Sequence, residues 1–155
     1  MACEVWDFGT LSFLFAGMVP DDKKAIAKKY GVSNGKVFES WLRSLNYLRN
    51  VCAHHSRLWN LNIIDQPKLP KVSEVSWVAL FVNNTHAIAR PFLLLCIVKY
   101  LLATINPTST WSSRLKELLI EFPDLLHLGV NLEGMGFVDG LEGWTSGMNN
   151  TNDRQ

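Results

Sequence analysis

The stretch from Leu48 to Asn60, LRNVCAHHSRLWN, holds the residues of this sequence that are best suited to chemistry. It combines two arginines, two adjacent histidines and two asparagines within thirteen positions. An imidazole exchanges protons near neutral pH, and a guanidinium group binds phosphate oxygens through paired hydrogen bonds. Phosphodiester cleavage uses both kinds of group. The composition of this stretch therefore favours a site that acts on nucleic acid.

The geometry of an ideal α-helix, which turns by 100° per residue, predicts how these side chains are arranged. One arc of such a helix collects polar groups around a small alanine, namely Asn46, Arg49, Asn50, Ala53, His54 and Arg57. The opposite arc is mostly apolar and contains His55, which makes a buried structural role an alternative for that histidine. We expect the catalytic groups to be Arg49, Asn50 and His54. We expect contacts to the substrate from Arg57, Asn46 and His55.

RNA is the substrate that this set of groups suits best, because the 2′-hydroxyl of RNA can serve as the nucleophile. A histidine that moves protons and an arginine that neutralises the developing charge then suffice, so we expect no metal and no cofactor. The competing interpretation is that the arginines are solvated surface charges, since an Arg and a His five positions apart can occur by chance. Cys52 falls on the apolar arc, where we expect a buried thiol.

The string YLRNVCAHHSRLWN resembles the signature of the Abi-like family of phage-resistance proteins. The upstream strings FGTLSFLFAGM, DDKKAIAKKYGV and SWLRSLNYLRN resemble the same family in the same order, so the likeness covers residues 6–60. Abi-like proteins belong to the HEPN superfamily, in which an arginine, a following polar residue and a nearby histidine form a metal-independent RNase site. Arg49, Asn50 and His54 match that pattern.

This resemblance implies an endoribonuclease that acts as a toxin in abortive infection. It also implies a homodimer formed through the helix that carries Arg49 and His54, with an antitoxin or a guide-like RNA as a further partner. Family members are usually longer, so the chain resembles a C-terminal half or a short member. Near the C-terminus the sequence GMGFVDGLEGW has Val138 where the family often has proline.

The remaining pattern of the sequence is helical throughout, without a repeat or a convincing strand. We expect helices over residues 8–19, 21–30, 33–60, 76–104 and 111–121, with Asp21 and Thr110 as caps and a loop over 61–73. The third helix is either continuous or broken near the double histidine. Pro91 is expected to kink or split the fourth helix. The prediction is an all-α helical bundle, HEPN-like by resemblance, with one domain over residues 1–138 and a flexible tail over 139–155.

The composition limits the partners and the compartment. A net charge of +1 gives no strong overall field, so attraction to RNA must be local, as in the lysine-rich segment before residue 44. Three scattered cysteines and an N-terminus without a signal pattern favour the cytoplasm. The apolar run 91–105 is short and contains Lys99, so we expect no membrane partner. Two other function classes remain open, a non-catalytic RNA-binding module and a protein-interaction domain.

Overall fold

The computed structural model describes residues 7–138, and the expected tail 139–155 lies outside them. These residues form six α-helices: α1 (Phe8–Gly17), α2 (Pro20–Lys29), α3 (Gly35–Ala53), α4 (Thr85–Ile88), α5 (Pro91–Ile105) and α6 (Trp111–Ile120). Short 3-10 helices lie at Ser76–Leu80, Leu126–Leu128 and Leu132–Met135. The extended pairing in residues 7–138 is a single bridge between Leu125 and Val130. The all-α prediction is confirmed.

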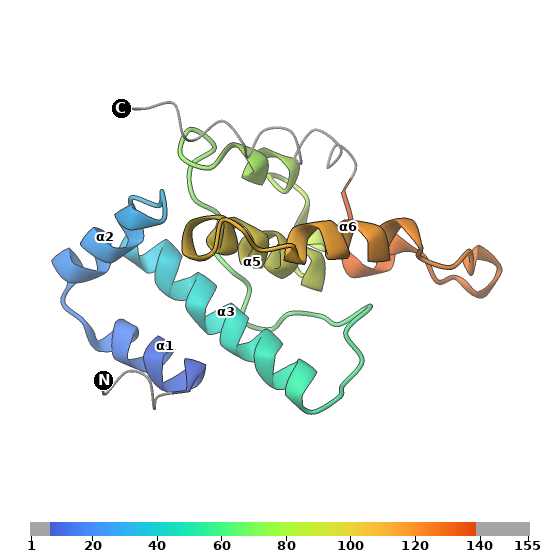
Figure 1. The fold of residues 1–155 in the computed structure, drawn as a ribbon, viewed down its shortest axis with the longest axis horizontal. Helices are drawn as coiled ribbons and strands as arrows, with labels where there is room; N and C mark the ends of the chain where they lie inside the picture. The colour runs from blue at the N-terminus through green and yellow to red at the C-terminus, as the bar shows by residue number, and fades with distance from the viewer. Residues whose placement is uncertain (1–6, 139–155) are drawn as a thin grey trace.

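Helix α3 is the centre of the fold, because α1, α2 and α5 all pack against it (Figure 1). Its inner face carries Trp41, which is completely buried. The indole of Trp41 meets the ring of Tyr100 of α5 edge-on at 5.8 Å between centroids. Phe38, one turn earlier, stacks on Tyr30 at 5.0 Å and touches Phe15 of α1 edge-on at 5.4 Å. These aromatic contacts hold α3 in one orientation.

The loop after α3 returns along that helix and is fastened to it by side chains. Ser40 Oγ accepts a hydrogen bond from the Lys68 backbone N–H at 2.9 Å, and Trp41 Nε1 donates to the Lys68 carbonyl at 2.9 Å. Ser44 Oγ donates to the carbonyl of Asp65. Burying a hydroxyl without a partner costs free energy, so the buried Ser40 and Ser44 need these bonds. The same bonds satisfy backbone groups of the loop and hold it over the core.

Of the two predicted caps, Asp21 is wrong, and Thr110 occupies the N-cap position of α6 without the hydrogen bond of a cap. Helix α2 begins at Pro20, preceded by Val19, so Asp21 lies in the first turn and does not cap the helix. Proline suits this first position because its fixed φ matches the helix and the N–H that it lacks has no partner there. Thr110 precedes α6 but makes no side-chain hydrogen bond to it.

The segment predicted as one helix over 76–104 is divided into three. A 3-10 helix ends at Leu80, the short α4 follows, and Pro91 occupies the first position of α5. Asn84 begins α4 by accepting a hydrogen bond from the Ala87 N–H at 3.0 Å. The predicted split at Pro91 is therefore confirmed, whereas residues 76–90 turn more tightly than a continuous helix.

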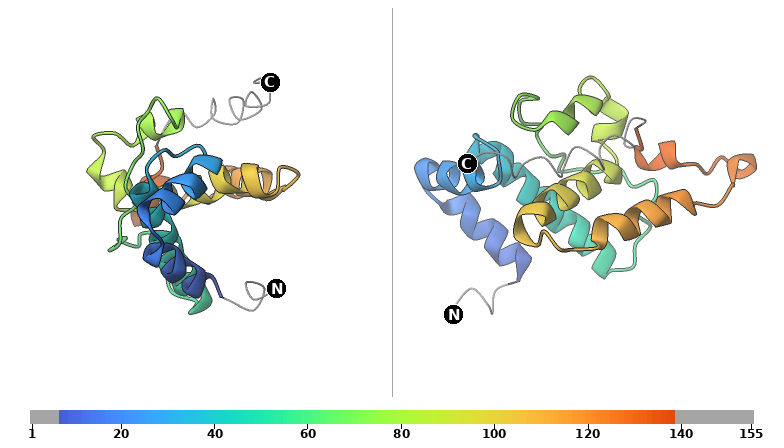
Figure 2. Two further views of the ribbon diagram at one scale, coloured as in Figure 1. Left: turned by 90° about the vertical axis from the view of Figure 1, so that its left-hand side faces the viewer. Right: turned by 45° about the horizontal axis from the view of Figure 1, so that its top comes forward.

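Helix α6 and the loop that follows it project from the other helices, as Figures 1 and 2 show. No residue of α6 is fully buried. No helix within residues 7–138 combines the length and the apolar character needed to cross a lipid bilayer.

Candidate functional site

Helix α3 ends inside the motif, at Ala53, so of the two alternatives for residues 33–60 the break near the double histidine is the one that occurs. His54 is the C-cap, and His55 adopts a left-handed backbone conformation with φ of 51°. The His55 N–H donates to the Cys52 carbonyl and the Ser56 N–H to the Val51 carbonyl, both at 3.1 Å. This pair of bonds is the Schellman motif, which ends a helix and redirects the chain. Histidine enters the left-handed region more readily than most residues other than glycine.

The early end of α3 changes where the later motif residues lie. His54 is the C-cap and keeps its predicted place one turn after Asn50, whereas His55 and Arg57 lie beyond the helix, so the helical-wheel positions predicted for these two residues are wrong; all three residues are exposed. The expectation that His55 is buried is wrong for the same reason. Cys52, expected as a buried thiol, is also exposed.

The inward rotation predicted for the helix itself does occur. Leu48 is buried, and Val51 and Leu58 are half-buried. The same rotation leaves Arg49 on the outer surface of α3, with Asn50 half-buried beside it.

Arg49 and Asn50 contact each other, and His54 lies one turn further along. Arg49 Nη1 donates to Asn50 Oδ1 at 2.9 Å. The backbone N–H of His54 donates to the Asn50 carbonyl at 3.1 Å. Asn50 therefore positions the guanidinium group of Arg49. Within residues 7–138, no hydrogen bond joins the side chains of Asn50 and His54. The imidazole of His54 is exposed at the end of the helix, where a ligand can reach it.

The beginning of α1 lies against the same part of α3 and brings an acidic group to the site. The side chain of Asp7 caps α1 by accepting a hydrogen bond from the Thr10 N–H at 2.7 Å. Hydrogen bonds from Thr10 lower the pKa of Asp7, and the nearby positive charge of Arg49 lowers it further. A Cβ atom on Gly9 would lie 3.2 Å from Asn46 Oδ1, which shows how closely α1 approaches α3.

Sequence reasoning missed Asp7 as a neighbour of the site. Its signal as a helix cap was present, since Asp7 stands directly before the apolar run of α1. Its proximity to Arg49 depends on the packing of α1 against α3, which no local pattern encodes. In this arrangement the charge of Asp7 lies near enough to Arg49 for each to stabilise the ionised form of the other, without a direct salt bridge between them.

The end of the motif has a structural task. Trp59 Nε1 donates to the Asn131 carbonyl at 2.7 Å, and Arg90 Nη1 donates to the Asn60 carbonyl at 2.6 Å. The indole of Trp59 covers Gly134, where a Cβ atom would lie only 2.5 Å from Cζ2. Trp59 therefore fastens the motif to the 3-10 helix Leu132–Met135, and Asn60 fastens it to Arg90, the residue before α5. The motif thus contains an exposed polar part that ends at Arg57 and an anchoring part that follows it.

Residues 7–138 contain no group of three or more His, Cys, Asp or Glu side chains placed to share a metal ion.

Comparison with known families gives one match. Residues 1–60 match the model of the family described as Abi-like protein. The matched range includes α1, α2, α3 and the whole motif, so every candidate site residue lies within it. No curated protein and no solved structure matches the chain. The resemblance stated for the N-terminal part is confirmed.

Proposed function

We propose, from the match of residues 1–60 to the Abi-like family model, that the chain is a metal-independent endoribonuclease of the HEPN type. Membership of this family suggests a role in abortive-infection phage defence. The observation that carries the enzymatic proposal is the contact between Arg49 and Asn50 on the surface of α3, with the exposed imidazole of His54 one turn away. Arg49 uses one of its N–H groups to bond to Asn50, so its other N–H groups are available to bind a phosphate.

The proposed reaction is an internal transfer within the RNA strand. The 2′-hydroxyl oxygen attacks the adjacent phosphorus, a bond forms between them, and the bond from phosphorus to the 5′-oxygen breaks. The products are a 2′,3′-cyclic phosphate and a free 5′-hydroxyl. One imidazole accepts the proton of the 2′-hydroxyl, and a second acid protonates the leaving oxygen. No water and no external nucleophile are consumed.

In this scheme His54 moves the proton, Arg49 neutralises the charge that develops on the phosphate oxygens, and Asn50 positions Arg49. Arg57 and His55 follow His54 in the exposed segment and contact the strand on that side. Asn46 lies one turn before Asn50, against the start of α1. The Asp7 carboxylate and an RNA phosphate compete for Arg49. When RNA binds, the phosphate takes the place of Asp7 as the negative group nearest to Arg49.

The requirement for both a base and an acid leads to a homodimer. One chain supplies a single His54, so a second copy supplies the other proton-transfer group. In the dimer we propose, the ends of the two α3 helices face each other across a two-fold axis, with one phosphate between them. An antitoxin or a guide-like RNA would then control access to this shared site.

The test is cleavage of end-labelled RNA in the presence of EDTA. The wild-type chain is expected to leave 2′,3′-cyclic phosphate ends, and His54→Ala is expected to lose roughly 100-fold or more in rate. His127→Ala is the matched control, because His127 is exposed on the projecting loop after α6 and should cleave as the wild type does. Activity that requires added Mg²⁺ or Mn²⁺, or a His54→Ala variant as active as the wild type, contradicts the proposal. RNA that is bound but never cleaved indicates the competing function, an RNA-binding module.

A mixing experiment tests the shared site. Arg49→Ala and His54→Ala homodimers should both be inactive, whereas their mixture should recover part of the activity. A monomer that cleaves RNA with a rate proportional to its concentration contradicts the dimer.

A further inference from the structure

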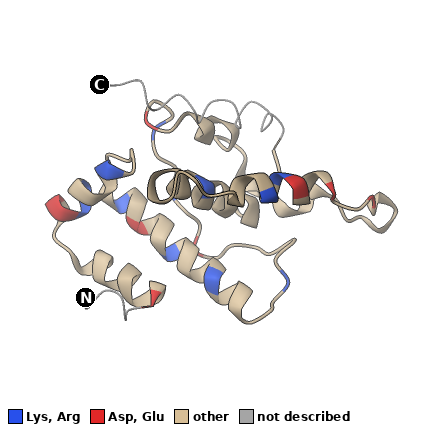
Figure 3. Ribbon diagram, viewed as in Figure 1, with Lys and Arg blue, Asp and Glu red and all other residues tan. Residues whose placement is uncertain are grey.

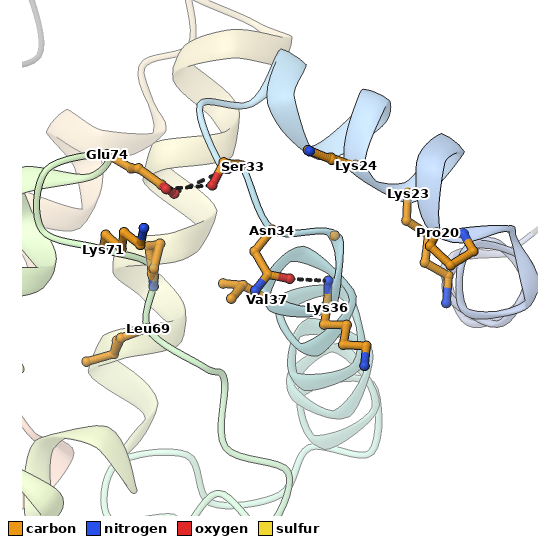
Figure 4. A pocket seen from close by; sticks show the side chains of 12 residues that line it. Pro20, Lys23, Lys24, Ser33, Asn34, Lys36, Val37, Leu69, Lys71 and Glu74 are labelled. Atoms are coloured by element: carbon orange, nitrogen blue, oxygen red, sulfur yellow. Dashed lines mark hydrogen bonds between the residues drawn. The ribbon is translucent and has the colours of Figure 1, made fainter.

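A hollow with charged residues in its lining lies at the other end of α3, away from the His54 site. Its volume is about 590 Å³, and it opens between the start of α2, the start of α3 and the loop that precedes the first 3-10 helix. The charged residues in its lining are Lys23, Lys24, Lys36, Lys71 and Glu74. Figure 4 shows Lys24 and Lys71 on opposite sides of the hollow, on separate segments. We call this region the lysine hollow.

Two of these five charges are already engaged. Lys23 Nζ forms a salt bridge with Glu39 at 2.7 Å and also donates to the Ala16 carbonyl at 2.5 Å. Glu74 accepts hydrogen bonds from Ser33, from Oγ at 2.5 Å and from the backbone N–H at 3.2 Å. These bonds lower the pKa of Glu74, and the charge of Lys71 adds to the effect. Glu74 is therefore ionised and held at one wall.

The other three lysines leave the hollow positive. Lys24, Lys36 and Lys71 are exposed and form no salt bridge with any residue between 7 and 138. Lysine ammonium groups that lack a carboxylate partner are the usual contacts for nucleic-acid phosphates. The net charge of +1 does not reveal this local excess of positive charge, because it sums the basic and acidic residues of the whole chain.

The exposed face of α3 connects the lysine hollow to the His54 site. Lys36, Arg43 and Asn50 are spaced by seven residues, so they lie on one face of the helix. Seven residues rise by about 10 Å, so Lys36 and Asn50 are roughly 21 Å apart along the axis. Arg43 is half-exposed midway, paired with Asp65 at 3.3 Å. Figure 3 shows basic residues recurring along α3 from one end to the other.

We propose that the lysine hollow and this face of α3 bind the sugar-phosphate backbone of a single RNA strand whose reacting phosphate lies at Arg49, Asn50 and His54. This inference rests on the proposed function, since it extends the same substrate beyond the reacting phosphate. It specifies the substrate as a strand long enough to span about three-quarters of α3. A dinucleotide would reach the His54 site but not the lysine hollow.

The experiment measures binding of a 2′-O-methyl RNA of about 20 nucleotides, which cannot be cleaved, as a function of salt concentration. Each phosphate contact on a single strand contributes about 0.7 to the slope of log K against log salt. The triple variant Lys24→Ala, Lys36→Ala, Lys71→Ala should therefore reduce the slope by about 2 and weaken binding by on the order of 100-fold at 0.1 M salt.

A matched control removes the same charge elsewhere. Lys28→Ala, Lys29→Ala, Lys116→Ala changes three exposed lysines that do not line the hollow, and it should keep the wild-type slope. The charge-keeping triple Lys24→Arg, Lys36→Arg, Lys71→Arg should bind as the wild type does. Wild-type binding by the arginine triple would show that the weaker RNA binding of the alanine triple comes from the lost charge and not from misfolding.

The outcomes separate this inference from the proposed function. Equal slopes for the two alanine triples overturn the inference, whether or not the chain cleaves RNA. Loss of binding confined to the hollow triple supports the inference even if no cleavage is detected, in which case the proposed enzymatic function is the one that fails. Polyglutamate that binds the wild type as tightly as the RNA also overturns the inference, because it indicates an acidic protein partner.

Discussion

The left-handed conformation of His55 leads to a prediction that separates the two adjacent histidines. An L-residue in this region costs roughly 1–2 kcal/mol, and glycine avoids that cost while adding about 0.5–1 kcal/mol of unfolded-state entropy. With φ of 51° at His55, His55→Gly should therefore have a stability within about 1 kcal/mol of the wild type. His55→Val should lose about 1–2 kcal/mol, because a β-branched side chain crowds the backbone there.

The assay is thermal unfolding followed by circular dichroism. For a chain of this size 1 kcal/mol changes Tm by about 2–4 °C, so the loss of about 1–2 kcal/mol should lower the Tm of the valine variant by roughly 2–8 °C and leave it below the glycine variant. Ser56 is the matched control, because it is also exposed and its φ is not positive. At Ser56 the valine variant should be at least as stable as the glycine variant. A His55→Val variant that melts at or above His55→Gly refutes the reasoning.

The same variants address catalysis. If His54 moves the proton and His55 shapes the end of α3, His55→Asn should retain cleavage to within about 10-fold, since asparagine also tolerates this backbone conformation. His54→Ala should lose about 100-fold or more. The reverse order of the two losses would assign the proton transfer to His55.

Three further predictions concern the supports of the site. Trp59→Phe removes the donor to the Asn131 carbonyl and should lower the free energy of unfolding in urea by about 1–2 kcal/mol. The control Trp111→Phe, at a half-buried tryptophan of α6, should change it little. Equal effects of the two substitutions would show that the anchor does not form. Ser40→Ala leaves the Lys68 N–H without its acceptor and should cost about 1 kcal/mol, with the exposed Ser113→Ala as the control and an unchanged midpoint as the contrary result. Because the pKa of Asp7 is lowered below its ordinary 3.8 in the fold, its stabilising effect is present above that value and is lost as the pH falls through the folded pKa. Asp7→Ala should therefore lower Tm at neutral pH and show a shallower decline than the wild type from about pH 5 to about pH 2; parallel curves would contradict a native-state role for the carboxylate.

Several features of this protein follow from the sequence alone, for local reasons. Apolar spacing places the helices and turns Leu48 toward the core, because a helix must bury its apolar face. Pro91 marks the start of α5, because proline is accepted in the first turn of a helix and not in its interior. The family match over residues 1–60, which includes the motif LRNVCAHHSRLWN, compares sequences and therefore does not depend on the structure.

Tertiary structure decided the features that depend on contacts between distant segments or on a single backbone angle. The end of α3 at Ala53 has no glycine or proline to announce it, since a histidine takes the left-handed position. That one angle redirects the chain after His55, so Arg57 does not lie on the helical wheel of α3. Asp7 reaches the neighbourhood of Arg49 only through the packing of α1 on α3, and Trp59 finds its acceptor 72 residues later. Helical periodicity describes neighbours three or four positions apart, so it predicted the faces of α3 but not the groups that other segments bring to them.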